Sequence, residues 1–157
     1  MAELSVIYRW MTPEDGVALR RLHRRSILLH AVRSYCPAIA HSWAEGLRPD
    51  GYAEAAAKGE AIEVAVVHGA VVGFCSVKGD EVKGLYVDPA FTRLGIASGL
   101  MTRALERIWR AGHDGARVTA ALSGVPFYES VGFRPTDERL RPTRGGLKMA
   151  VVEMARP

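Results

Sequence analysis

The chain has 157 residues, of which 48% are hydrophobic and 24% charged, as expected for one globular domain over residues 1–157 with a sizeable core. No apolar run reaches the roughly 20 residues that span a bilayer, and the opening MAELSVIYRW lacks the basic and apolar regions of a signal peptide. We therefore expect a soluble, cytoplasmic protein with no membrane partner. The net charge of +4 permits an anionic ligand without requiring one.

The cysteines and histidines do not have the spacing of a metal site. Cys36 and Cys75 are the only cysteines and neither belongs to a CxxC pair, while the five histidines form no HxxxH motif. We predict two buried free thiols and no metal.

A basic cluster in LRRLHRRS contains four arginines at helical spacing, Arg20, Arg21, Arg24 and Arg25. No aromatic residues interleave with them and no nucleic-acid-binding motif follows. A solvated helix face is therefore favoured over a nucleic-acid surface.

In chain order, a first strand is predicted at 5–10, where polar and apolar residues alternate. Thr12, Pro13 and two acids then supply a helix start, and the helix is expected to run from about 13 to 33, ended by Cys36-Pro37. The Ala-rich segment that follows, broken by glycines and a proline, suggests short helices at 38–45 and 49–58.

The period then changes to valine-rich runs separated by His68-Gly69 and Lys78-Gly79-Asp80. Turn dipeptides between β-branched runs predict an antiparallel meander with strands at 62–67, 71–78 and 82–87. The next helix is the clearest element, because eight apolar residues from Ile96 to Trp109 fall on one face. Beyond Gly112 we predict a strand at 118–122, a short helix at 125–130 and a closing strand at 147–154.

The stretch DPAFTRLGIASGL begins this helix with small residues, Gly95, Ala97, Ser98 and Gly99, at a cost in helix propensity. Small residues leave the first N–H groups of the helix uncovered, and such an end binds phosphate well. Arg93 could add a charge-assisted contact. We interpret the glycines as allowing a phosphate close to the backbone, with a loop of poor helix formers as the alternative. Walker and dinucleotide motifs are both missing.

Three segments together, GLYVDP, FTRLGIASGLM and VPFYESVGF, resemble the core of the GNAT superfamily of acetyl-CoA-dependent N-acetyltransferases. The family segment [Q/R]xxGx[G/A] corresponds to Thr92–Ala97, with Thr92 in place of Gln or Arg. The family motif FYxxxGF is met by Phe127, Tyr128, Gly132 and Phe133, and the resemblance covers about 62–133. It implies an α+β fold of three layers, with a central, mostly antiparallel mixed sheet flanked by helices.

The resemblance also implies roles for individual residues. Tyr128 would be the general acid to the coenzyme A sulfur, unless it is only a core aromatic. The backbone of Leu85, Tyr86 and Val87 would bind the pantetheine arm and the thioester oxygen. The pyrophosphate would be held by the segment Thr92, Arg93, Leu94, Gly95, Ile96, Ala97 and Ser98. Many relatives carry Asn where this chain has Ala121, and often Ala where it has Gly124.

Histone-acetylating relatives carry a catalytic glutamate eleven residues before the pyrophosphate motif, which corresponds to Glu81 here. Strand alternation would place Glu81, Lys83 and Leu85 on one face. Glu81 is our first choice for the general base. The alternatives are a solvated turn carboxylate at Glu81 and another acid acting through water.

The acceptor is expected opposite the coenzyme, under the first helices. SYCPAIAHSWAEGL resembles a helical segment in a small bacterial branch of the superfamily. Tyr35 and Trp43 either line the acceptor pocket or anchor the short helices to the sheet.

Two functions follow from these observations. The first is transfer of acetyl from acetyl-CoA to a primary amine by direct attack in a ternary complex, with a homodimer favoured because dimers are the commonest assembly. The second is a non-catalytic acyl-CoA-binding sensor. The fold does not specify the acceptor.

Overall fold

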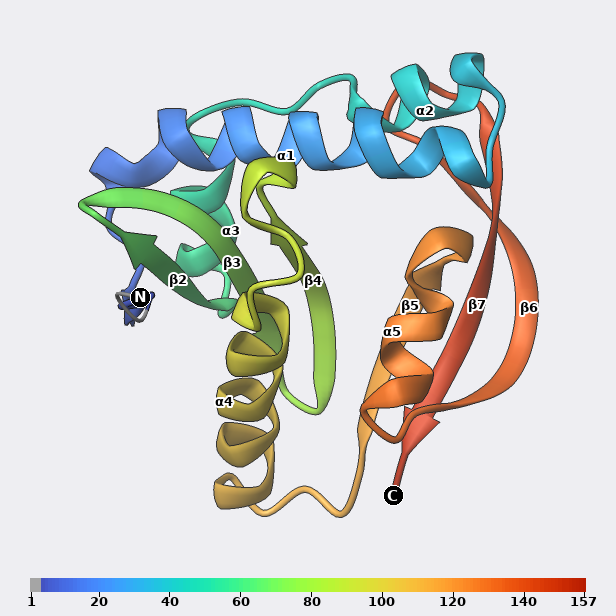
Figure 1. The fold of residues 1–157 in the computed structure, drawn as a ribbon. Helices are drawn as coiled ribbons and strands as arrows, with labels where there is room; N and C mark the ends of the chain where they lie inside the picture. Colours follow the sequence, from blue (N-terminus) through green and yellow to red (C-terminus); the bar gives the residue numbers. More distant parts are fainter. Residues whose placement is uncertain (1–3) are drawn as a thin grey trace.

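The computed structural model describes residues 4–157 as a seven-stranded sheet with helices on both faces (Figure 1). The strand order is β1-β2-β3-β4-β5-β7-β6, and only β4 and β5 are parallel. The α+β class and the mostly antiparallel mixed sheet are thereby confirmed. The strands are β1 (Ile7–Trp10), β2 (Ala61–Val67), β3 (Ala70–Lys78), β4 (Glu81–Val87), β5 (Ala116–Ala121), β6 (Arg134–Pro142) and β7 (Lys148–Arg156). The helices are α1 (Gly16–His30), α2 (Pro37–Ala44), α3 (Gly51–Ala57), α4 (Ile96–Arg110) and α5 (Val125–Ser130).

The long first helix forms as predicted, with a 3-10 turn at each end of α1. Its start is held by Asp15, whose carboxylate accepts a hydrogen bond from the Thr12 N–H at 2.8 Å and pairs with the Arg9 guanidinium at 2.8 Å. Since Arg9 belongs to β1, this carboxylate also attaches the first strand to the first helix. None of the helices in residues 4–157 has the length and apolarity that crossing a membrane takes.

Strand β2 shows how alternation divides the core into two layers. Ile62, Val64 and Val66 pack with residues of α1 and α3 on one face, while Ala65 and Val67 pack with residues of α4 on the other. The sheet is therefore the middle of three layers. The predicted apolar face of α4 is confirmed, and its buried residues are Ile96, Leu100, Met101, Ala104, Leu105 and Ile108.

Helix α1 extends beyond the first four strands. Its Ile27 and the following Ala31 pack with Met149 and Val151 of β7. In Figure 1, α1 accordingly crosses the top of the molecule from the β2–β3 side to β7. The two ends of the sheet are thus held by one helix.

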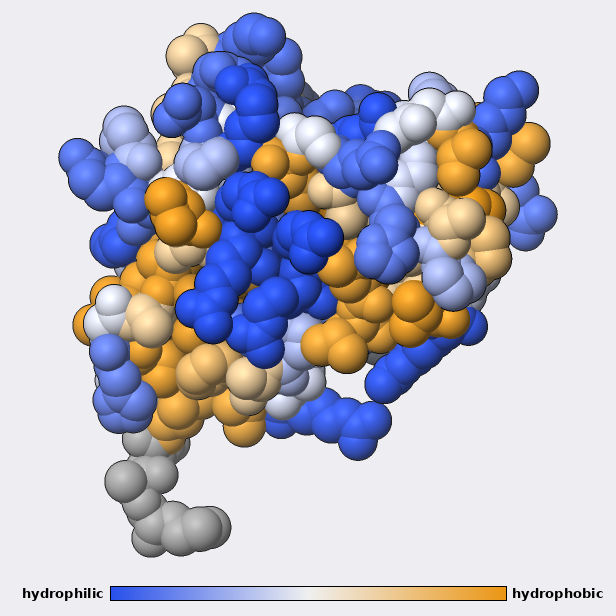
Figure 2. Space-filling model, turned by 90° about the horizontal axis from the view of Figure 1, so that it is seen from above, coloured by the Kyte–Doolittle hydropathy of each residue, from blue (hydrophilic) through white to orange (hydrophobic). Residues whose placement is uncertain are grey.

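The arginine cluster lies on the outer side of α1, and Figure 2 shows hydrophilic side chains gathered on the face seen from above. Arg21 and Arg24 are exposed. Arg20 donates to the Leu47 carbonyl at 3.0 Å, and Arg25 pairs with Asp88 at 3.3 Å. Two of the four arginines therefore attach α1 to neighbouring loops.

A bulge interrupts β4 at Lys83. In the register with β3, Val77 faces Val82 while the adjacent Ser76 faces Gly84, so Lys83 is an extra residue. Val82 and Leu85 both pack on the α4 side, which simple alternation does not allow. The expectation that Glu81, Lys83 and Leu85 share one face is therefore wrong, because the bulge reverses the faces of the strand.

Two sequence predictions need correction. We predicted no strand between α5 and the closing strand, but β6 pairs with β7 over the whole of Arg134–Pro142. Every residue of β6 is exposed, and the strand contains two prolines and five charged side chains. These residues protect an edge strand from pairing with another chain. They leave no alternation of apolar and polar residues from which the strand could be predicted. Cys75 is buried as predicted, but Cys36 is exposed, because it lies just before α2 at the surface.

Candidate active site

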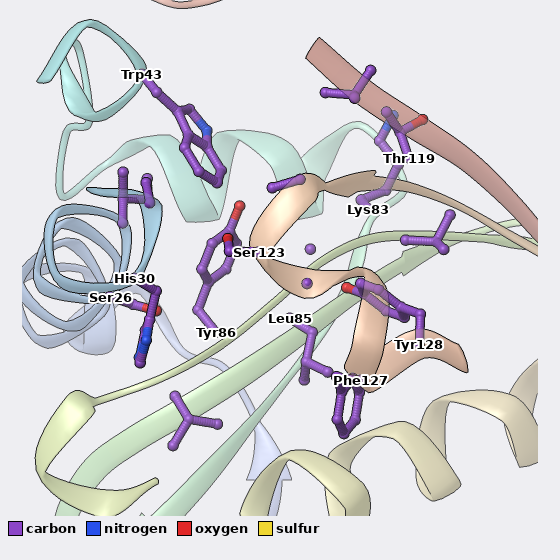
Figure 3. A pocket seen from close by; sticks show the side chains of 18 of the residues that line it. Ser26, His30, Trp43, Lys83, Leu85, Tyr86, Thr119, Ser123, Phe127 and Tyr128 are labelled. Atoms are coloured by element: carbon purple, nitrogen blue, oxygen red, sulfur yellow. The ribbon is translucent and has the colours of Figure 1, made fainter. Parts of the chain in front are cut away.

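Strands β4 and β5 pair at only two positions, Glu81 with Arg117 and Val82 with Val118, and then diverge. The divergence opens a cavity of about 340 Å³, called here the cleft (Figure 3). The cleft is lined by β4, β5, the α5 region, the N-terminal part of α4, and α1 with Trp43 above it. A parallel pair that separates after two residues leaves polar backbone groups of both strands facing the cleft.

The β4 side of the cleft is formed by Leu85, Tyr86 and Val87. These residues pair with β3 on one side only, since the β5 register ends at Val82. Backbone groups directed away from β3 are therefore available to a ligand. In Figure 3 the Tyr86 side chain points toward Trp43, and their ring centroids are 6.5 Å apart.

Tyr128 enters the cleft from the opposite side, on α5. Its ring is buried between Phe127 and Phe133, with centroid distances of 5.5 and 5.7 Å. No hydrogen bond to its hydroxyl occurs within residues 4–157, so this group is unsatisfied by the protein. Burial raises the pKa of Tyr128 above its usual range. The phenol is therefore protonated at neutral pH and can donate a proton into the cleft.

The segment before α4 has the backbone of an anion-binding loop. Arg93 and Gly95 both adopt positive φ, at 63° and 80°, and a side chain added at Gly95 would meet nothing within 4 Å. Within the described chain, the backbone amides from Arg93 to Ser98 have no hydrogen-bond partner. The first helical bond is from Gly99 to the Gly95 carbonyl. Six adjacent amides without a partner in the described chain, at the positive end of a helix dipole, are available to an anion.

Gly99 requires a different explanation from the one that the sequence suggested. A Cβ atom there would collide with the Tyr8 hydroxyl, which reaches α4 from β1. The small residue at this position accommodates Tyr8 and so serves packing. Only Gly95, with its left-handed backbone and open surroundings, keeps the role first assigned to both glycines.

Tyr35 and Trp43 pack edge to face, with ring centroids 6.3 Å apart, but only one of them lines the cleft. Tyr35 is buried, donates to the Ala150 carbonyl at 2.6 Å and accepts from the Leu122 N–H at 2.8 Å. It is not among the residues that line the cleft, and it fastens the turn before α5 to β7. Trp43 is half-buried and does line the cleft.

Glu81 lies at the start of β4, before the divergence from β5. Its carboxylate pairs with Lys83 at 3.1 Å and with Arg117 at 3.7 Å. The structure brings Tyr128, Trp43 and the β4 backbone together around the cleft but does not include Glu81 in its lining. The cleft has one imidazole, His30, and its burial together with the nearby Arg33 lowers the pKa of that ring.

A second cavity of about 330 Å³ lies on the α1 and α3 side of the sheet and is called here the aromatic cavity. Its walls include His23, Tyr52, Phe74 and Tyr86. The residues that line both cavities are Lys83, Gly84, Tyr86, Arg141 and Arg144, so the two adjoin at the β4 bulge.

The aromatic cavity contains one carboxylate and one unsatisfied ring nitrogen. Glu60 accepts a hydrogen bond from Ser76 Oγ at 2.6 Å and is the one acid, among the described residues, that lines either cavity. His23 Nδ1 is 2.9 Å from the Tyr52 hydroxyl, while its Nε2 is buried without a partner in residues 4–157. Burial lowers the pKa of His23 to about 3, so this ring is neutral.

Four residues of the cavities had no role predicted from the sequence, namely Glu60, His23, Arg141 and Arg144. His23 is next to Leu22 and four residues after Leu19, on the buried stripe of α1, and that spacing could have identified it. No comparable signal marks the two arginines, because they lie in the segment whose strand was missed. Within residues 4–157, no group of three or more His, Cys, Asp and Glu side chains could hold a metal ion.

Comparison with known families agrees with this geometry. The family described as "Acetyltransferase (GNAT) domain" matches residues 31–153, which is most of the chain. The protein belongs to the GNAT acetyltransferases. It is therefore an acyltransferase of the acetyl-CoA-dependent N-acetyltransferase class.

Individual GNAT relatives are similar over nearly the whole length. The uncharacterized N-acetyltransferase YafP of Escherichia coli strain K12 is 28% identical over 133 residues, which cover 85% of this chain and 84% of YafP. A GCN5-related N-acetyltransferase from Rhodopseudomonas palustris superposes with a TM-score of 0.89 at 23% identity, covering 99% and 98% of the two chains. The PaiA N-acetyltransferase from Thermoplasma acidophilum, solved in complex with coenzyme A, gives 0.79 at 20% identity, covering 98% and 99%.

Proposed function

We propose that this GNAT protein transfers the acetyl group of acetyl-CoA to a primary amine by direct attack in a ternary complex. The observation that carries the proposal is the cleft, where the free backbone edge of β4 faces the Tyr128 hydroxyl across the divergence from β5. A linear thioester arm fits such an edge, because the exposed strand offers successive hydrogen-bonding groups.

The coenzyme is proposed to enter with its pyrophosphate at the N-terminus of α4 and its pantetheine arm along β4. The six unpartnered amides from Arg93 to Ser98 support the first contact, and the unpaired side of Leu85–Val87 supports the second. Thr92 contributes little through its side chain, because its hydroxyl donates to the Pro89 carbonyl at 3.1 Å.

In the proposed reaction, the neutral amine nitrogen attacks the thioester carbon and the C–S bond breaks as the oxyanion collapses. Tyr128 gives its proton to the departing thiolate. The proton lost by the nitrogen as the C–N bond forms balances the one gained by sulfur, and the phenolate regains a proton from solvent. A β4 amide facing the cleft would stabilise the oxyanion.

Deprotonation of the incoming ammonium needs a general base, and two carboxylates are proposed for comparison. Glu81 is the residue that the family resemblance implies, but it is not part of the cleft lining and its carboxylate is paired with Lys83 and Arg117. Glu60 is favoured by position, because its partner Ser76 is paired with Gly84, where the two cavities adjoin. The variants Glu60→Gln and Glu81→Gln would identify which carboxylate is required. The comparison is of kcat/KM against pH, where loss of the general base should lower kcat/KM and change its fall at low pH.

The test of the coenzyme site is titration calorimetry with acetyl-CoA. Ser98→Glu places a carboxylate among the proposed phosphate-binding amides, while the same change favours the helix dipole and so keeps α4 stable. Thr102→Glu, one turn further along on the exposed side, is the matched control. We expect Ser98→Glu to weaken binding at least tenfold without lowering the Tm, and Thr102→Glu to bind as the unaltered protein does. Equal binding by both variants would refute the assignment, and no binding by the folded, unaltered protein would refute the function.

A further inference from the structure

The aromatic cavity adjoins the cleft on the opposite side of β4. That its ligand is the acetyl acceptor rests on the proposed function, whereas the chemistry of the ligand follows from the cavity itself. Four of the side chains that line the cavity are rings packed on one another. The His23 centroid is 4.0 Å from that of Tyr86 and 5.4 Å from that of Phe74, and Tyr52 packs on Phe74 at 5.7 Å. These rings form a wall for the apolar part of a small molecule.

Some of the cationic side chains that line this cavity are in ion pairs and others are not. Arg48 pairs with Glu54, and Lys83 pairs with Glu81. Arg141 and Arg144 form no ion pair with any described residue, and Arg144 donates a hydrogen bond to the Trp43 carbonyl at 2.7 Å. Two guanidinium groups at the junction of the cavities are therefore available to an anion.

The charges of these two arginines act on the cavity wall. Burial raises the pKa of Tyr86, and both guanidinium charges oppose that rise. The Arg144 charge likewise adds to the burial that lowers the pKa of His23. The guanidinium charges therefore act on the pKa values of the rings in the cavity wall, although both arginine side chains are solvent-exposed at the rim.

His23 offers a further donor from within the wall. Burial keeps the Tyr52 phenol protonated by raising its pKa. Among the described residues this hydroxyl has no hydrogen-bond partner besides His23 Nδ1, so we assign the Tyr52 O–H as the donor to that nitrogen. The ring proton of neutral His23 then lies on Nε2, which is the buried nitrogen that lacks a partner. An unsatisfied buried donor is costly unless a ligand or water accepts from it.

The aromatic cavity is thus rich in donors and has a single acceptor acid, Glu60, close to the cleft. We propose that the aromatic cavity is the acceptor pocket and that it selects amines that also carry a carboxylate, such as amino acids. The carboxylate lies against Arg141 and Arg144, the apolar part packs on the rings, and the amine lies toward Gly84 and Glu60, facing the thioester.

The test compares each acid with its own neutral amide as acceptor. Phenylalanine, leucine, methionine and glutamate are each assayed beside their C-terminal amides by release of coenzyme A thiol. We expect kcat/KM to be at least tenfold higher for one or more acids than for the corresponding amides. The Arg141→Gln and Arg144→Gln variants should lose that preference by lowering the rate with the acid only, and Arg→Lys at each position should restore part of it.

Arg134→Gln is the control, since Arg134 is exposed on the same strand and lines neither cavity. Equal rates with acids and amides, or arginine variants that slow both alike, would overturn the inference. Acetyl-CoA binding without acetylation of any acid in the set would also overturn it while leaving the proposed function standing.

A binding measurement tests the carboxylate preference of the aromatic cavity independently of the proposed acetyltransferase function. N-acetylphenylalanine and its amide are titrated into the protein with tryptophan fluorescence, with and without coenzyme A. Tighter binding of the acid, reduced at least tenfold by Arg144→Gln, supports the anion preference even if acetyl-CoA itself fails to bind. Equal affinity for the acid and the amide contradicts the preference.

Discussion

Removal of the Tyr128 hydroxyl provides the sharpest test of the proposed chemistry. Tyr128→Phe keeps the ring between Phe127 and Phe133, and the lost hydroxyl has no protein partner in the described chain. We therefore expect the free energy of unfolding to change by less than about 0.5 kcal/mol. The affinity for acetyl-CoA should also stay within about twofold, since a phenol removed from the sulfur end changes few ground-state contacts.

The effect on turnover can be sized from the surroundings of the phenol. General acids typically contribute about 10²–10⁴ in rate. Burial raises the pKa of Tyr128, whereas an ordinary thiol has a pKa of about 8.5, so proton transfer to the thiolate is uphill and the lower end of that range applies. We expect kcat to fall about 100-fold, which corresponds to about 2.7 kcal/mol.

The assay is thiol release at saturating acetyl-CoA, with Tyr8→Phe as the control because that hydroxyl packs on Gly99 outside the cleft. Between pH 7 and 9.5 the unaltered protein should show no loss of kcat from ionisation of Tyr128, since its raised pKa keeps it protonated. A kcat for Tyr128→Phe within threefold of the unaltered protein would refute the acid role, whereas binding of acetyl-CoA with no turnover of any amine by the unaltered protein would favour the non-catalytic sensor.

Three further predictions concern stability. Burial lowers the pKa of His23 to about 3, below the unfolded value of about 6.5, so the unfolded state binds the proton more readily and stability is lost as the pH falls below 6.5. From pH 7 to pH 5 this loss is about 2 kcal/mol, and a urea titration of His23→Gln should show a correspondingly flatter pH dependence; equal slopes would contradict the assignment. Gly99→Ala should destabilise by about 1–3 kcal/mol through its collision with the Tyr8 hydroxyl, despite the better helix propensity of alanine, whereas the exposed Ser98→Ala should be neutral or stabilising by thermal melting. Tyr35→Phe removes two hydrogen bonds and should cost about 1–3 kcal/mol in urea, and a cost below 0.5 kcal/mol would show that these bonds do not hold the turn before α5.

The sequence predicted the elements whose periodicity is strong. The apolar face of α4 and the valine-rich strands β2 to β4 were located within about two residues, since burial on one or both faces leaves a regular pattern. Strand β6 was missed because an exposed edge strand has no buried face, and without a buried face its sequence has no regular apolar pattern. Its omission also hid Arg141 and Arg144, which depend on the β6–β7 hairpin for their place beside β4.

The candidate site was predictable only where a motif carries the geometry. Tyr128 and the loop before α4 were found through short segments whose backbone shape is local, such as the left-handed Gly95. The bulge at Lys83 could not be predicted, because it arises from the register between β3 and β4. That single extra residue determines which side chains of β4 face each cavity, including Tyr86.

The incomplete pairing of β4 with β5 has a consequence for the motions of the molecule. Within residues 4–157 the strand ladder between the first four strands and the last three has only two residue pairs, and α1 packs across both parts. A bound coenzyme arm would act as a missing strand and couple the two parts of the sheet. Amide hydrogens of Leu85–Val87 and of the segment after Ala121 should then exchange with solvent together, and both should slow together on coenzyme binding. Opening of the sheet at this seam would consequently limit how fast coenzyme A leaves after each turnover.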